Sequence, residues 1–126
     1  RWRSINITDQ DVAFIDAHLG RGLSEQSARA LIWTLRNGFF FRRGLDRRQD
    51  VLLLNYEDLV RDPVSVVGRA YRFVGLEFRQ SYVAGVFASS VGKQRGPAID
   101  PEVERLCAEM QRRLDDCRQL SLSKSP

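Results

Sequence analysis

The sequence predicts a mostly helical α/β chain with one buried parallel strand at about residues 51–56. The apolar run Val51–Leu54 is bounded by polar residues, which is typical of a short strand covered on both faces. An Asp-Pro pair occurs at Asp62-Pro63 and again at Asp100-Pro101, and this pair favours the start of a helix. The composition, 43% hydrophobic and 29% charged, is that of a folded globular chain.

Two helices are expected ahead of the strand. Thr8 is a suitable N-cap for the first helix, and Asp11 completes a weak capping box. Gly20 and Gly22 then mark its end. Ser24 caps the second helix, which carries the apolar stripe Ala28, Leu31, Ile32, Leu35 and Phe39.

Further helices are expected after the strand. One starts at Asp62-Pro63 and ends before Gly75, and a shorter one covers about residues 78–87. The last helix starts at Asp100-Pro101 and carries the stripe Val103, Leu106, Cys107, Met110, Leu114 and Cys117. Residues 89–98 are expected to form a loop and residues 121–126 a frayed tail, so residues 1–120 are expected to belong to one domain.

The cysteine pattern, the single histidine and the length of the apolar runs exclude several classes of protein. Cys107 and Cys117 would lie about 15 Å apart along one helix, so they cannot form a disulfide and are expected to be small core residues. A single histidine, His18, makes a zinc site improbable, and we expect His18 to have a structural or surface role. No apolar run reaches the roughly 18 residues of a membrane helix.

The net charge of +4 favours an anionic ligand, and no nucleic-acid-binding motif accompanies it. Of the 20 cationic residues only Lys93 and Lys124 are lysines, so arginine dominates. Arginine suits bidentate contacts with phosphate. The arginine cluster within residues 42–48 is open to two interpretations, a solvated loop or a patch that attracts an anion.

The most informative segment is residues 51–78, which read VLLLNYEDLVRDPVSVVGRAYRFVGLEF. This segment resembles the C-terminal half of sulfotransferases that use 3′-phosphoadenosine 5′-phosphosulfate (PAPS). In that family a buried strand leads to Tyr-Glu-Asp-Leu, and an Asp-Pro helix ends in a Phe-Leu-Gly-Leu-like sequence. Here Val74 replaces the Leu before Gly75. A helix with Trp33, Arg36 and Asn37, and the Ser-Ser-Val-Gly-Lys stretch at 89–93, extend the resemblance to about residues 28–118.

The resemblance implies a nucleotide site. Tyr56 would contact PAPS from the end of the strand, where α/β sheets bind nucleotides, and its ring would pack against the nucleotide. Ser90 and Lys93 would bind the phosphate side, and Arg95 is a weaker candidate for the same contact. Gln94 replaces the Trp that is usual in this loop of the family.

The resemblance also implies a P-loop-type sulfotransferase fold of which this chain is a C-terminal fragment. The phosphosulfate-binding loop and the catalytic base of the family are missing from the sequence, so no catalytic residue is assigned and the fragment alone is expected to be inactive. The intact enzyme would transfer a sulfuryl group from PAPS, without a metal, to a hydroxyl or amine acceptor. That acceptor would be a small molecule or a glycan. The expected partner is the missing N-terminal half of the domain, and the expected location is the cytoplasm.

Several alternatives remain open at this stage. The chain could be a non-catalytic, Arg-rich helical module that binds an anionic partner, or part of a kinase-like transferase with a P-loop fold. Tyr56 could serve only packing, and residues 89–96 could be a solvated basic loop. The carboxylates Glu57 and Asp58 are expected to be structural, capping a turn or pairing with an arginine, because a carboxylate repels an anionic nucleotide.

Overall fold

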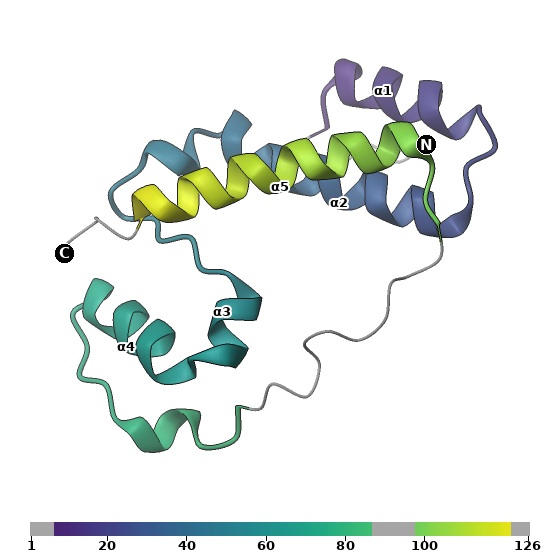
Figure 1. The fold of residues 1–126 in the computed structure, drawn as a ribbon. Coiled ribbons are helices and arrows are strands. Elements are labelled where there is room, and N and C mark those ends of the chain that lie inside the picture. The colour runs from purple at the N-terminus through teal and green to yellow at the C-terminus, as the bar shows by residue number, and fades with distance from the viewer. Residues whose placement is uncertain (1–6, 87–97, 122–126) are drawn as a thin grey trace. The chain divides into compact units, whose positions relative to one another are not determined.

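The computed structural model describes residues 7–86 and 98–121, and these form helices joined by turns and extended segments (Figure 1). The elements are α1 (Asp9–Leu19), α2 (Glu25–Arg42), the 3₁₀ helix η1 (Leu45–Arg47), α3 (Tyr56–Arg61), α4 (Pro63–Phe73), the 3₁₀ helix η2 (Gln80–Val83) and α5 (Pro101–Ser121).

The chain divides into two compact units. The first unit comprises residues 1–43 and 96–111, and the second comprises residues 44–95 and 112–126. Helix α5 contributes to both, up to Gln111 in the first unit and from Arg112 in the second. The expectation of one domain over residues 1–120 stays a prediction.

Helix α1 begins at the cap that the sequence predicts. The Thr8 hydroxyl accepts a hydrogen bond from the Asp11 backbone N–H at 3.2 Å, and the Thr8 N–H donates to the Asp11 carboxylate at 2.9 Å. This reciprocal pair is a complete capping box. Gly20 ends the helix in a right-handed conformation, and Gly22 then adopts a φ of +70°.

In the first unit, α2 packs alongside the N-terminal part of α5. Ser24 caps α2, as predicted, by accepting from the Ser27 N–H. The Asp100 N–H donates to the Ser27 hydroxyl at 2.9 Å, and Thr34 lies 3.2 Å from the Cys107 sulfur. Because the numbers of both partners rise together, the two helices run parallel. Leu31 and Val103 are fully buried in this unit.

Three more predicted helix starts and ends are confirmed in the other described residues. Asp62 accepts from the Ser65 N–H at 3.1 Å and Pro63 opens α4. Gly75 follows α4, which ends before it as predicted, and has a φ of +71°, the left-handed conformation common just after a helix. Asp100 accepts from the backbone N–H groups of Glu102 and Val103, so it caps α5.

The predicted strand at about residues 51–56 is absent, and the described residues contain no strand. Residues 51–55 have no regular secondary structure, and Tyr56 is the first residue of α3 instead of the last residue of a strand. A strand requires a hydrogen-bonded ladder with a second strand, and no other described segment supplies one. The Asn55 side chain also accepts from the backbone N–H groups of Glu57 and Asp58, which starts the helix at Tyr56.

The predicted helix at residues 78–87 is shorter than expected. Of its described residues, which end at 86, only Gln80–Val83 is helical, and it is a 3₁₀ turn. Its side chains join a cluster with α4, in which the rings of Tyr71, Phe78 and Tyr82 lie 5.6 to 6.3 Å apart. Gly68 on α4 allows this contact, since an added Cβ would come within 3.3 Å of the Phe78 ring. Ring packing therefore holds this segment, with little regular backbone structure.

The two cysteines are free, as the sequence predicts. Cys117 is buried, whereas Cys107 is half-buried against α2.

Candidate functional site

Tyr56 is the predicted site residue that the structure describes. It opens α3 directly after the capping residue Asn55, and it is 63% exposed. An exposed ring at a fixed helix start is open to a ligand that offers a flat apolar face. Ser90, Lys93 and Arg95 lie outside the described residues, so their predicted phosphate contacts stay predictions.

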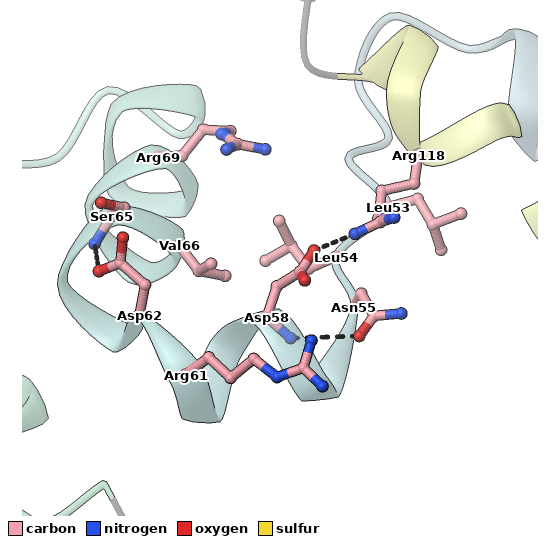
Figure 2. A pocket seen from close by; sticks show the side chains of 10 residues that line it. All are labelled: Leu53, Leu54, Asn55, Asp58, Arg61, Asp62, Ser65, Val66, Arg69 and Arg118. Carbon is pink, nitrogen blue, oxygen red and sulfur yellow. Dashed lines mark hydrogen bonds and ion pairs between the residues drawn. The ribbon is translucent and has the colours of Figure 1, made fainter. Parts of the chain in front are cut away.

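The carboxylate of Asp58, two residues further along α3, forms an ion pair with Arg118 of α5 (Figure 2). Arg118 Nη1 donates to Asp58 Oδ2, and Arg118 Nη2 lies 3.7 Å from Asp115 Oδ1. The Arg118 side chain is only 23% exposed, while that of Asp58 is 42% exposed. The pair therefore links the Tyr-Glu-Asp-Leu motif to the C-terminal part of α5, inside the second unit.

A pocket of about 240 Å³ lies beside this ion pair (Figure 2). Its walls come from the segment before α3, from α3 and α4, and from Arg118. The lining residues are Leu53, Leu54, Asn55, Asp58, Arg61, Asp62, Ser65, Val66, Arg69 and Arg118.

Most charged side chains that line the pocket pair with one another or with another group on their own helix. Arg61 lies 3.7 Å from Glu57, one turn earlier on α3. The side-chain and backbone hydrogen bonds from Ser65 lower the pKa of Asp62. Arg69 has no carboxylate within ion-pair distance among the described residues. The pocket thus combines apolar walls with a small surplus of positive charge.

His18 lies in the first unit and is buried. Its Nδ1 is 2.7 Å from the Phe14 carbonyl oxygen, and its ring packs on Phe14 with centroids 4.2 Å apart. Its Nε2 lies 3.7 Å from Glu102. These contacts give His18 a packing role between α1 and α5.

No metal centre is found in the described part of the chain, where no three His, Cys, Asp or Glu side chains gather closely enough to hold an ion. In the second unit, four carboxylates lie near arginines: Asp50, Glu57, Asp58 and Asp115.

A family model described as "Sulfotransferase domain" matches residues 26–93, just over half of the chain. The chain belongs to the sulfotransferase family. This confirms the family that the sequence resemblance indicated. The matched region includes Tyr56, Ser90 and Lys93, and it ends before Arg95 and Arg118. No curated protein and no solved structure matches the chain.

The contact that sequence reasoning missed in this sulfotransferase is the one between Asp58 and Arg118. The sequence suggested that Asp58 would pair with a nearby arginine, but the partner is 60 positions further along the chain. Arg118 follows Cys117 at the edge of the apolar stripe of α5, and an arginine at such an edge is common on surface helices. No local spacing connects it to the motif.

None of the helices in the described ranges of this sulfotransferase is both long and apolar enough to cross a membrane.

Proposed function

We propose that this chain forms the C-terminal part of a sulfotransferase domain and supplies part of its nucleotide-binding wall. The enzyme would transfer a sulfuryl group from PAPS to a hydroxyl or amine of a small molecule or glycan. The observation that carries the proposal is the exposed Tyr56, which an Asn55-capped helix holds within the region that matches the family.

Each nucleotide-binding residue has a distinct role in this proposal. The ring of Tyr56 packs against the nucleotide, and its hydroxyl forms a hydrogen bond with a phosphate. Ser90 donates a hydrogen bond, and Lys93 and Arg95 supply positive charge to the phosphate groups. The carboxylate of Asp58 faces Arg118, which lowers its repulsion of the anionic donor.

Sulfuryl transfer would occur by in-line displacement. The acceptor oxygen or nitrogen forms a new bond to sulfur while the bond between sulfur and the phosphate oxygen breaks. The electron pair leaves on the 5′-phosphate of adenosine 3′,5′-bisphosphate, and the acceptor proton passes to a base. The base and the phosphosulfate-binding loop would come from the N-terminal half of the domain, so we expect residues 1–126 alone not to transfer sulfate.

The complete domain would have an α/β P-loop-type fold. In that fold residues 51–54 would pair with strands from the N-terminal half, which also supplies the missing cover for their apolar side chains. The segment already ends at the capped start of α3, so pairing would extend the backbone up to Asn55 without displacing Tyr56 from its helix.

The alternative of an Arg-rich module that binds an anion is less well supported. Many of the arginines are engaged by carboxylates of the same chain, which reduces their attraction for an external anion. The paired arginines are Arg21, Arg29, Arg42, Arg48, Arg61, Arg105 and Arg118.

Titration calorimetry with adenosine 3′,5′-bisphosphate on the full-length protein tests the proposal. Tyr56→Ala is expected to weaken binding by about tenfold, since base–aromatic stacking is worth about 1–3 kcal/mol. Tyr56→Phe is expected to cost less, because it keeps the ring. Tyr82→Phe, a change of another exposed tyrosine, is the matched control and should leave the affinity unchanged. Equal affinities for Tyr56→Ala and the unmodified protein would remove Tyr56 from the site.

A further inference from the structure

Helix α3 carries the Tyr-Glu-Asp-Leu motif but is too short to hold its own orientation. It has six residues, and the segment before it has no regular secondary structure. Isolated helices shorter than about 12 residues are marginal in water, so contacts from outside the helix must fix it. The N-cap at Asn55 sets where α3 starts, but a cap does not set how the helix is rotated about its axis.

The ion pair between Asp58 and Arg118 adds a directional restraint to the one that the buried Val60 gives α3. Residues two positions apart on a helix project about 160° away from each other, so a helix that turns Asp58 toward α5 turns Tyr56 away from it. This agrees with the exposure of the two residues, since the Asp58 side chain is 42% exposed and Tyr56 as a whole residue is 63% exposed. Figure 2 shows Asp58 directed at Arg118 beside the pocket.

Arg118 is itself well placed to act as an anchor. Its side chain is mostly covered, and its Nη2 group is also near Asp115, one turn earlier on α5. The neighbouring residues Cys117 and Ser121 are buried, so this end of α5 is packed where Arg118 leaves it. An arginine with two carboxylates and a fixed backbone gives a directional contact that a flexible lysine does not reproduce.

We propose that Arg118 is a positioning residue for nucleotide binding: through Asp58 it fixes the rotation of α3 and so the direction of Tyr56. The inference rests on the proposed function, because a role for Arg118 in nucleotide binding requires that Tyr56 contacts the nucleotide. Arg118 lies outside the region matched by the family model, so the match does not include this residue.

The test compares Arg118→Ala with Arg112→Ala in the full-length protein, because Arg112 is an exposed arginine of the same helix. Titration calorimetry with adenosine 3′,5′-bisphosphate separates the two possible roles of Arg118. A loss of folded protein lowers the binding stoichiometry and keeps the dissociation constant, whereas a misdirected Tyr56 raises the dissociation constant at full stoichiometry.

Arg118→Ala and Asp58→Asn are each expected to raise the dissociation constant about five- to fiftyfold, and the double variant no more than either one, because both remove the same pair. Arg118→Lys should recover part of the affinity, and Arg112→Ala should match the unmodified protein. Unchanged affinity in both Arg118→Ala and Asp58→Asn, or a lowered stoichiometry alone, would overturn the proposal.

A second measurement does not depend on the ligand. Fluorotyrosine placed at position 56 reports the surroundings of that ring by ¹⁹F NMR. Its resonance should move in Arg118→Ala and Asp58→Asn and stay in place in Arg112→Ala. A resonance that stays in place in all three variants contradicts the positioning role even where the nucleotide binds. A resonance that moves in a protein that binds no nucleotide would refute the proposed function while leaving the restraint on α3 intact.

Discussion

Each unit contains an ion pair between an aspartate near a helix start and a distant arginine, and the two pairs differ in burial. In the first unit Asp11 is only 6% exposed, and its carboxylate accepts from Thr8 and lies 2.9 Å from Arg42. In the second unit Asp58 is half exposed, and Arg118 is the arginine that holds it.

The difference indicates different tasks. Burial alone would raise the pKa of Asp11, but the hydrogen bonds from Thr8 and the charge of Arg42 outweigh it, and the pKa is lowered. Arg42 also stacks on the Phe39 ring at 4.5 Å, so the first pair belongs to a packed junction of α1 with α2. The second pair lies at a pocket and next to an exposed aromatic residue. We therefore expect the first pair to contribute mainly to stability, and under the proposed function the second pair orients the ligand-binding residue.

The largest effect on stability is expected at Leu31, which is fully buried in the first unit. Leu31→Ala should lower the free energy of unfolding by about 2–5 kcal/mol because it removes buried methyl groups and leaves a cavity. Ile32→Ala, on the exposed neighbour, should cost well under half as much. Urea unfolding measures both variants. If the division of tasks is correct, folded Leu31→Ala keeps its nucleotide affinity; a large loss of affinity at full stoichiometry would break the comparison.

Lys93→Ala is expected to show the opposite pattern. The loss of one charge-assisted phosphate contact should weaken binding of adenosine 3′,5′-bisphosphate by about 1.5–3 kcal/mol, or roughly ten- to a hundredfold. The midpoint of urea unfolding without ligand should not change. Lys124→Ala alters the other lysine of the chain and serves as the control. Calorimetry that gives Lys93→Ala the affinity of the unmodified protein would exclude Lys93 from the site.

The smallest effect concerns the pH dependence of the first unit. Because the pKa of Asp11 is lower in the folded state, its contribution to stability is present above the unfolded-state pKa of about 4 and is lost as the pH falls through the folded-state value. Asp11→Asn should therefore cost about 1 kcal/mol at pH 7 and progressively less toward pH 2. Urea unfolding at several pH values measures this difference, and a constant difference across the range would contradict the assignment.

The sequence was a good guide to helix starts, because the groups that cap a helix are neighbours in the chain. Thr8, Ser24, Asp62 and Asp100 each accept from a backbone N–H two or three residues later, as their residue types predict. Such contacts close within one helical turn and need no other part of the molecule.

The sequence was a poorer guide where a structure depends on distant partners. The apolar run Val51–Leu54 has strand-like composition, but a strand forms only with a ladder partner, and the described residues contain none. Asp58 and Arg118 are 60 positions apart, and no local sequence pattern indicates that α3 and α5 contact each other. Tyr56 therefore follows from its motif and stays a prediction as a site residue, whereas the contact of Asp58 with Arg118 could not be predicted from the local sequence.

Photoaffinity labelling with 8-azidoadenosine 3′,5′-bisphosphate tests the central claim, that the Tyr56 region of this sulfotransferase forms a nucleotide-binding wall. Trypsin cleaves after Arg48 and Arg61, so the motif is recovered in one peptide, residues 49–61. We expect label in this peptide of the full-length protein, and we expect unlabelled nucleotide to compete it away. Label confined to other peptides, or label in residues 49–61 that excess nucleotide does not reduce, would contradict the account.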